Sequence, residues 1–248
     1  MLKKNKKLKY PKNYFEKKAW QENLYVCGID EVGRGCFAGP LVVSAAILPI
    51  NTKHKLLKDS KVLTEQEREL AYEWLIKRCF YSTAIISNQQ IDKINIYQAT
   101  KLAMKKTFYQ ILQTIPFDSK KLKSLLIDAI PVDLEQIYKK ENLEVFSMNY
   151  GESISTSIAA ASIIAKVTRD NLMKKIHKIF PSFKLDQHKG YGTQLHRNLI
   201  INNGISIIHR KTFVSSTITQ NTAIQACLTQ NTSVAQKEKN DKQTSLFR

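Results

Sequence analysis

The sequence predicts an α/β protein with a mixed central sheet flanked by helices. Short apolar runs rich in β-branched residues alternate with longer helical stretches, and the first two runs are close enough in the chain to form a hairpin. A hairpin makes its two strands antiparallel, whereas strands joined through a helix are usually parallel. We therefore expect both kinds of strand pairing in one sheet, followed by a helical C-terminal part.

The expected elements follow from apolar patterning and from helix start and stop signals. Strands are expected over residues 24–29, 41–48, 81–87, 125–127 and 143–148. Helices are expected over residues 64–78, 92–112, 153–179 and 193–203. Thr64 and Glu67 match a capping box at the start of the first helix. Pro181 stops the third helix, and Gly204 closes the last one.

The chain carries a large excess of positive charge. Its 248 residues include 39 Lys+Arg and 21 Asp+Glu, and 39 − 21 gives the formal net charge of +18. Such a charge favours an anionic partner, and a nucleic-acid backbone meets that need. A hydrophobic content of 43% excludes a wholly disordered chain, so we expect a folded domain with a core of its own.

The sequence predicts three segments in the chain. Residues 1–20 are predicted to be a basic mobile arm, since the first eighteen hold eight lysines and one glutamate. Residues 21–214 form the folded domain, and residues 215–248 form a polar tail that we expect to be disordered, like the N-terminal arm. Apolar runs are too short to span a membrane and no signal peptide is evident, so we expect a cytoplasmic location. The four cysteines lack zinc-ligand spacing and are expected to be reduced thiols.

The strongest chemical feature is the pair Asp30 and Glu31 at the end of the first apolar run. Adjacent carboxylates raise each other's pKa unless a cation neutralises them, and oxygen ligands select hard ions such as Mg²⁺ or Mn²⁺. Asp128 repeats this placement at the end of the run 125–127, and carboxylates at strand ends can converge at one edge of a sheet. An ordinary acidic turn is the alternative in each case.

A glycine-rich stretch follows the acidic pair. Gly33 and Gly35 flank Arg34, which would let the backbone approach a ligand and aim a guanidinium at phosphate. The stretch also has the spacing of a dinucleotide fingerprint, G-x-G-x-x-G/A. However, Pro40 and the β-branched run after it predict a strand where that motif requires a helix, and the preceding carboxylates would repel a pyrophosphate. We therefore reject the dinucleotide interpretation.

Two acidic residues are associated with the long helix predicted over residues 153–179, one directly before it and one within it. Glu152 directly precedes this helix, and capping of its N-terminus is the simplest role for the side chain. Asp170 follows Lys166 by four residues, so a local ion pair on the helix surface is expected.

Six short segments occur in an order that is typical of one enzyme family. They are GIDEVGRG at 28–35, DSK at 59–61, IDKINI at 91–96, LID at 126–128, AASIIAKVTRD at 160–170 and HKGYGT at 188–193. Taken together they resemble the type 2 ribonucleases H, and specifically bacterial ribonuclease HII. The resemblance implies an RNase H-like fold and makes residues 21–214 the catalytic domain.

The family resemblance implies a metal-dependent endoribonuclease. Such an enzyme hydrolyses the RNA strand of RNA/DNA hybrids and cuts on the 5′ side of a single ribonucleotide in a DNA duplex. The implied metal ligands and catalytic residues are Asp30, Glu31, Asp128 and Glu152, which would hold two Mg²⁺ or Mn²⁺ ions. Ribonuclease HII usually has Asp at the last of these positions, and Glu resembles the sister ribonucleases HIII, which leaves metal preference and substrate choice open. Ala129 is a second departure, since bacterial members commonly have Gly there.

The resemblance also implies a set of substrate-binding residues: Gly33, Arg34, Gly35, Lys61, Lys166 and Tyr191. The Gly-Arg-Gly backbone would read the ribose 2′-hydroxyl, the tyrosine ring would stack beside the ribose, and the lysines would contact phosphate. From the sequence alone the lysines are equally well explained as solvated surface residues. We expect a monomer that binds RNA/DNA hybrids and ribonucleotide-containing duplex DNA, with no membrane partner.

The end of the tail carries a short peptide pattern. Gln243, followed by Leu246 and Phe247, resembles the peptide by which bacterial replication and repair proteins dock on the sliding clamp. A disordered end with two isolated apolar residues is the alternative.

Two other functions fit part of the sequence. A basic nucleic-acid-binding protein without catalysis would need only the +18 charge and the lysine-rich arm, but it would not need acids at all four ligand positions. Another metal nuclease of the same fold, such as a junction resolvase, would not need a Gly-Arg-Gly ribose reader or Tyr191. Cleavage of a DNA duplex that contains one ribonucleotide discriminates among the three.

Overall fold

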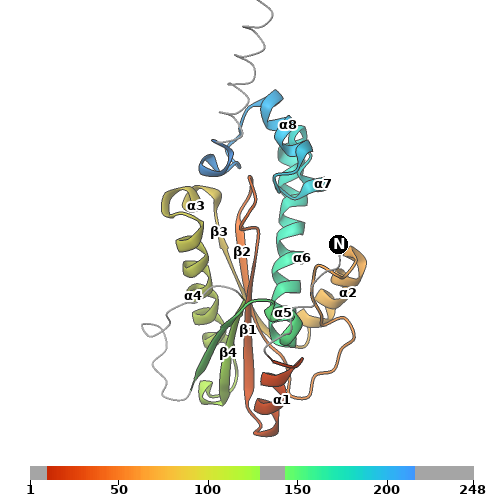
Figure 1. The fold of residues 1–248 in the computed structure, drawn as a ribbon, viewed down its shortest axis with the longest axis vertical. Coiled ribbons are helices and arrows are strands. Elements are labelled where there is room, and N and C mark those ends of the chain that lie inside the picture. The colour runs from red at the N-terminus through yellow and green to blue at the C-terminus, as the bar shows by residue number, and fades with distance from the viewer. Residues whose placement is uncertain (1–9, 129–142, 216–248) are drawn as a thin grey trace, which may run out of the picture.

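A five-stranded mixed sheet organises the fold (Figure 1). The structure, a computed structural model, describes residues 10–128 and 143–215. The strands are β1 Tyr25–Val32, β2 Leu41–Ile47, β3 Phe80–Ile86, β4 Leu122–Asp128 and β5 Glu144–Met148. They lie in the order β3-β2-β1-β4-β5, with β1 antiparallel to β2 and parallel to β4. The predicted α/β class with a mixed sheet is therefore confirmed.

Helices cover both faces of the sheet. The helices are α1 Tyr14–Gln21, α2 Glu65–Ile76, α3 Asn88–Ile94, α4 Ile96–Thr114, α5 Gly151–Ile154, α6 Thr156–Ile179, α7 Leu185–His188 and α8 Gln194–Asn203. Figure 1 shows α3 and α4 on one face, the long α6 on the other, and α7 and α8 beside the far end of α6. Among the described residues, no helix combines the length and the apolar character that crossing a bilayer would require.

Alternate residues of β1 face these two helical layers, because side chains alternate along a strand. Cys27 and Ile29 belong to the core that includes α4, whereas Val26 belongs to the core that includes α1 and α6. Gly28 lies on the α6 side, where a Cβ atom would fall 2.2 Å from the backbone carbon of Ser157. The missing side chain therefore lets α6 run directly against the central strand.

Two of the predicted helices are each divided by a capping residue. The helix expected over residues 92–112 is α3 followed by α4, because Asn95 has φ 63° and its side chain accepts a hydrogen bond from Gln98 N at 3.0 Å. The helix expected over residues 153–179 is α5 followed by α6, where Ser155 Oγ accepts from a backbone amide at 3.1 Å. Short polar side chains can accept hydrogen bonds from backbone amides and so end one helix and begin the next. Apolar periodicity alone does not predict such breaks.

The N-terminal segment differs from its prediction. Residues 1–20 are predicted to be a mobile arm, but α1 occupies the second half of that segment and packs with Phe15 buried. Glu16 is also buried, and its Oε1 accepts from Ser157 N at 3.0 Å and from the Ser155 hydroxyl. The arm prediction is therefore wrong for residues 10–20, because lysines on the exposed side of α1 mask its buried side. Residues 1–9 and, apart from its first residue, the predicted tail lie outside the described residues.

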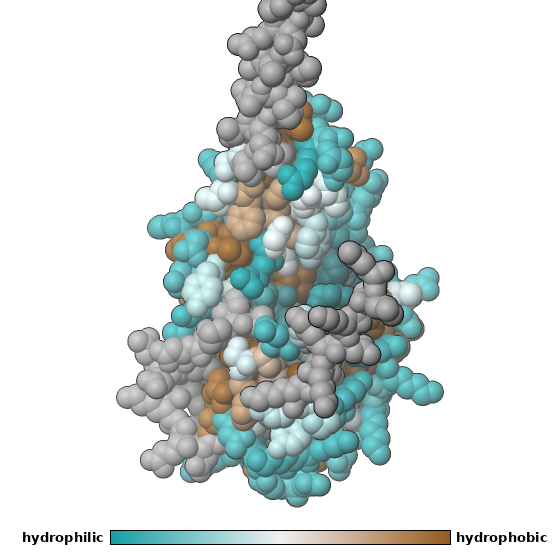
Figure 2. All heavy atoms as spheres, viewed as in Figure 1, coloured by the Kyte–Doolittle hydropathy of each residue, from teal (hydrophilic) through white to brown (hydrophobic). Residues whose placement is uncertain are grey.

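The face seen in Figure 2 is largely hydrophilic. Apolar side chains of the described residues form small, separate groups in this view. A broad apolar surface usually marks a protein interface.

Candidate active site

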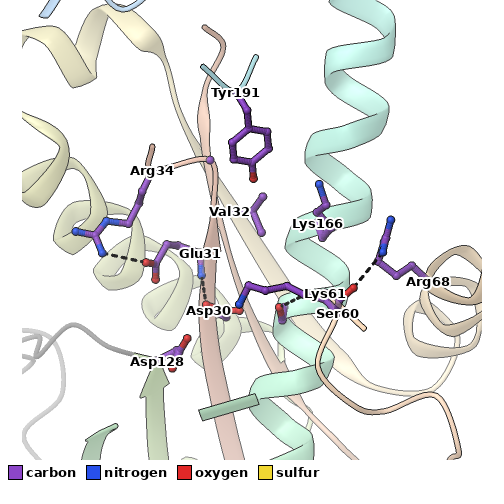
Figure 3. Close-up of a pocket in the computed structure, with 12 residues that line it drawn as sticks. Asp30, Glu31, Val32, Arg34, Ser60, Lys61, Arg68, Asp128, Lys166 and Tyr191 are labelled. Atoms are coloured by element: carbon purple, nitrogen blue, oxygen red, sulfur yellow. Dashed lines mark hydrogen bonds and ion pairs between the residues drawn. The ribbon is translucent and has the colours of Figure 1, made fainter. Parts of the chain in front are cut away.

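A cavity of about 420 Å³ lies at the end of β1 and β4 (Figure 3). Its walls are formed by Asp30, Glu31, Val32, Gly33, Arg34, Ser60, Lys61, Arg68, Asp128, Ser162, Lys166 and Tyr191. Eight of the ten predicted site residues in the described chain are in this set; Glu152 and Gly35 are not. Residues from β1, β4, α2, α6 and three loops, far apart in the sequence, therefore meet in one place.

The parallel pairing of β1 and β4 brings two carboxylates side by side. Ile29 lies opposite Ile127 in this register, so the next residue of each strand is an aspartate, Asp30 and Asp128. Asp128 ends its strand as predicted, but β1 continues to Val32 and keeps both of its acids within the strand. Glu31 consequently points to the opposite side of the strand from Asp30.

Burial raises the pKa of all three carboxyl groups. Desolvation, and then the charges of Glu31 and Asp128, hold the pKa of Asp30 well above its usual range. Desolvation raises the pKa of Glu31 to about 7, although Arg34 Nη1 lies 3.3 Å from its Oε1 and opposes the shift. Desolvation also raises the pKa of Asp128, against a hydrogen bond from Gly151 N at 2.9 Å. A nearby cation would stabilise the ionised form of all three.

Glu152 lies behind the cavity wall, in the first turn of α5, and is 4% exposed. Its carboxylate accepts a hydrogen bond from Ser162 Oγ at 2.9 Å and forms an ion pair with Lys61 Nζ. Ser60 Oγ lies 3.5 Å from the same carboxylate. The predicted capping of the long helix by this side chain is wrong, because Ser155 and the α1 glutamate occupy that position instead.

The four acids fit a divalent cation in ligand type, although they do not form a closed ligand set. Carboxylate oxygens suit Mg²⁺ and Mn²⁺, and the buried Oε2 of Glu31 has no hydrogen-bond partner. Within residues 10–128 and 143–215, no three His, Cys, Asp or Glu side chains are grouped closely enough to hold a metal. Instead, Arg34 and Lys61 pair with Glu31 and Glu152. The pair with Arg34 uses only Oε1 of Glu31, so Oε2 remains as a candidate metal ligand.

Of the other predicted substrate-binding residues, Lys166, Tyr191 and Gly33 also line the cavity. Lys166 Nζ lies 2.9 Å from Asp170 Oδ1, which confirms the predicted local pair, and 5.6 Å from the centroid of the Tyr191 ring. Gly33 has φ +96°, a conformation that favours glycine. Gly35 is exposed, and a Cβ atom there would meet nothing within 4 Å. The backbone at Gly35 is therefore open to a ligand, whereas Gly33 lines the cavity and is buried against Arg169.

Some cavity residues were not predicted individually. Ser60 and Ser162 lie inside two of the six family-like segments. Their position in those segments is the sequence feature that could have indicated a place in the site. They donate to Glu152 and lie 2.8 Å from each other. Arg68 Nη1 donates to Ser60 O at 3.1 Å, and nothing in the local sequence marks this arginine.

Comparison with known proteins identifies one family. The family model described as Ribonuclease HII matches residues 27–216. Ribonuclease HII of Bacillus cytotoxicus is 41% identical over 221 residues, which cover 85% of this chain and 79% of that protein. Ribonuclease HII of Caldicellulosiruptor saccharolyticus is 38% identical over 219 residues, which cover 86% of this chain and 99% of that protein.

Solved structures share the fold. The structure of Bst-RNase HIII in complex with Mn²⁺ has a TM-score of 0.63 at 20% identity, covering 83% of this chain and 72% of that chain. The PCNA:RNase HII complex from Archaeoglobus fulgidus has a TM-score of 0.59 at 26% identity, covering 75% of this chain and 94% of that chain. These similarities agree with the RNase H-like fold expected from the sequence.

Proposed function

The chain belongs to the ribonuclease HII family, and we propose that it hydrolyses the RNA strand of RNA/DNA hybrids and incises duplex DNA 5′ of single ribonucleotides. Family membership supports a ribonuclease H activity. The observation that carries the finer proposal is one cavity in which Asp30 and Asp128 adjoin the Gly33 backbone and the Tyr191 ring. Cleavage chemistry and ribose recognition would then share one site.

The proposed chemistry needs no protein nucleophile. Two divalent ions, when held by the four acids, would activate water and stabilise the leaving oxygen in an in-line displacement at phosphorus, leaving 3′-hydroxyl and 5′-phosphate ends. The candidate ligands are Asp30, Glu31, Asp128 and Glu152. The Mn²⁺ complex of the ribonuclease HIII neighbour supports divalent metal use. The raised pKa values of Asp30 and Asp128 also support it, because a nearby positive charge would stabilise the ionised form of both carboxyl groups.

The proposed substrate recognition uses the backbone of residues 33–35, Tyr191 and two lysines. The amide groups of residues 33–35 would contact the 2′-hydroxyl, which DNA lacks, and Tyr191 would stack against the ribose. Lys166 lines the cavity beside that ring, and Lys61 has a side chain that is 77% exposed. Both lysines line the cavity, which supports the proposed phosphate contacts.

Cleavage of a labelled DNA duplex with one central ribonucleotide tests the proposal. We expect one cut on the 5′ side of the ribonucleotide with Mg²⁺ or Mn²⁺, none with a chelator, and none on the matched all-DNA duplex. Binding without any cut would favour the non-catalytic nucleic-acid-binding protein. A cut in the all-DNA duplex would favour another nuclease of this fold.

We also propose that the C-terminal peptide docks on a sliding clamp. Its residues Gln243, Leu246 and Phe247 lie outside the described residues. The Archaeoglobus structure, a complex of an RNase HII with PCNA, supports a partner of this kind. A peptide of the last twelve residues should bind the clamp weakly, because it must become ordered on docking. Equal binding by the Leu246→Ala/Phe247→Ala peptide, or no binding by either, would end this proposal.

A further inference from the structure

Two arginines are buried outside the carboxylate cavity, beneath the loop that follows β1. Arg169 comes from α6 and Arg210 from the segment after α8, and both have 0% exposure. Neither takes part in any ion pair of the described residues. Burying a cation without an acidic partner is costly unless its hydrogen bonds compensate. The groups that accept those hydrogen bonds therefore indicate the role of the two arginines.

Both guanidinium groups bind carbonyl oxygens of the loop 33–40. The bonds run from Arg169 Nε to Pro40 O at 2.9 Å, from Arg169 Nη2 to Ala38 O at 3.2 Å, from Arg210 Nε to Gly39 O at 3.0 Å and from Arg210 Nη1 to Arg34 O at 2.8 Å. Hydrogen bonds to a charged donor are stronger than neutral ones. Four carbonyls of this loop are therefore held by two cations beneath it.

Arg169 also connects this loop to the loop that carries Tyr191. Its Nη1 donates to Lys189 O at 2.9 Å, and its guanidinium carbon lies 5.5 Å from the centroid of the tyrosine ring. Gly33 packs on the same side chain, since a Cβ atom there would fall 2.2 Å from Arg169 Nε. One arginine side chain thus sets the spacing between the glycine backbone and the aromatic ring.

The carbonyl bonds leave amide groups of the loop available. In the described chain, backbone hydrogen bonds outside the helices and strands do not use the N–H groups of Gly33, Arg34 and Gly35. Gly39 N, by contrast, donates to Ile208 O at 2.9 Å. The part of the loop nearest the cavity keeps free donors, and its remaining part is fixed to the body of the protein.

We infer that Arg169 and Arg210 are positioning residues for ribose recognition, which hold the 33–35 backbone and Tyr191 at the spacing that distinguishes a ribonucleotide from a deoxyribonucleotide. This inference rests on the proposed function. A planar guanidinium can bind several carbonyls in fixed directions, whereas a lysine ammonium is a single point of charge. Replacement by lysine should therefore keep the charge and lose the spacing.

Binding measurements separate this role from cleavage and from general support of the fold. In an Asp30→Asn background, which the proposed function makes inactive, Kd is measured with Mg²⁺ for a duplex with one ribonucleotide and for the all-DNA duplex. We expect Arg169→Lys and Arg210→Lys each to reduce the preference for the ribonucleotide about tenfold, because small misplacements of recognition groups are costly. Affinity for the all-DNA duplex should change less than about threefold, since phosphate contacts remain.

Arg78→Lys is the matched control. Arg78 is exposed, lies with its guanidinium carbon 5.3 Å from the Trp74 ring centroid, and is outside the cavity and the two loops, so the preference should not change. An unchanged preference in both arginine variants, or failure of both to fold by circular dichroism, would overturn the inference and leave the arginines a structural role. If the Asp30→Asn parent has no preference, the proposed ribose recognition itself is wrong, together with the inference built on it.

Discussion

The carboxylate cavity and the histidine cluster, formed by His196 of α8 and His209, both bury ionisable groups, but burial has different consequences in the two places. In the cavity, burial raises the pKa of Asp30 well above its usual range and that of Glu31 to about 7. Glu31 Oε2 is buried without a hydrogen-bond partner. Arg34 pairs with Glu31 Oε1 and opposes the shift, so the positive charge near these acids offsets their burial only in part.

The histidine cluster, in contrast, satisfies its ring nitrogens internally. His209 Nδ1 accepts from Ser206 N at 3.0 Å, so we assign the proton to its Nε2, which lies 3.2 Å from His196 Nε2. His196 Nδ1 then donates to Tyr191 O at 2.9 Å. Burial lowers the pKa of both His196 and His209 to about 4, so both rings are neutral at pH 7.

The difference indicates which buried groups bind a ligand and which support the fold. Buried polar groups in proteins are normally hydrogen-bonded, and the exceptions concentrate at functional sites. Removing an acid whose charge is destabilised by burial and by neighbouring carboxylates should therefore reduce activity and increase stability, whereas disturbing a hydrogen-bonded histidine should reduce stability first. Each of the following experiments tests one side of this contrast.

The largest effect is expected from Asp30→Asn. Loss of a charged ligand with little change of shape should lower cleavage by about 10³-fold or more. Because the pKa of Asp30 is raised, its ionised form destabilises the fold at neutral pH, and the variant should melt higher in EDTA. A gain of about 1 kcal/mol corresponds to about 2–4 °C in a domain of this size. Wild-type cleavage, or a lower melting temperature with normal cleavage, would remove this residue from the site.

Glu152 should have the next largest effect. Glu152→Gln removes the charge while keeping the length, and we expect cleavage to fall about 100-fold. Glu152→Asp moves the carboxylate by about one C–C bond length. The variant should therefore retain activity, but the ratio of its cleavage rate with Mg²⁺ to that with Mn²⁺ should change. Initial rates with each metal decide this. Full activity of Glu152→Gln would mean that its bonds to Ser162 and Lys61 are structural only.

Local sequence patterns were sufficient to predict most of the sheet, but they did not predict features that depend on one polar residue. Apolar runs gave the positions of all five strands, whereas the helix breaks at Asn95 and Ser155 depend on a single side-chain cap each. The run before Asp30 suggested that the strand ends there, but pairing with β2 carries it on to Val32. Pairing between strands is a tertiary effect that a period-2 pattern does not contain.

The candidate site was predictable where its residues lie in recognisable segments. Asp30 and Asp128 were expected to converge because both end apolar runs, and the register of β1 and β4 brings them together. The buried arginines could not be predicted in the same way. Arg210 bonds Gly39 across 171 positions of the chain, and neither residue type nor spacing indicates that contact. Burial of a cation without an acidic partner becomes visible only in the folded structure.

Acidification should act in opposite directions on the two regions. Unfolded histidine takes up a proton near pH 6.5, but His196 and His209 resist it until about pH 4, so their contribution to stability is lost as pH falls through that window. Glu31, with a pKa raised from 4.5 to about 7, contributes stability as pH falls from about 7 to 4.5. Each group changes the free energy of unfolding by at most about 1.4 kcal/mol per pH unit.

Melting temperatures in EDTA between pH 7 and 4 separate these contributions. Glu31→Gln should make the loss of stability on acidification steeper, because the stabilising term is gone. His209→Asn, whose side-chain oxygen can still accept from Ser206, should make the loss shallower. Parallel melting curves for wild type and both variants would contradict the contrast between the two regions.

The smallest effect is expected from Glu16, which tests whether burial of an acid is by itself enough to predict a catalytic role. Glu16 has 0% exposure, against 5% for Asp30, and it lies outside the cavity. Its Oε1 accepts from Ser157 N and from the Ser155 hydroxyl at the start of α6, whereas its Oε2, like that of Glu31, has no hydrogen-bond partner. Removing its charge in Glu16→Gln weakens a favourable interaction with the helix N-terminus, which is typically about 0.3–1 kcal/mol. The variant should therefore melt about 1–4 °C lower and cleave within about twofold of wild type. Glu16→Ala, which also removes the acceptor, should melt lower still with the same activity. A loss of cleavage comparable to that of Asp30→Asn in a folded Glu16→Gln protein would show that burial alone, rather than a place beside other carboxylates in the cavity, marks the functional acids, and the contrast between the two regions would fail.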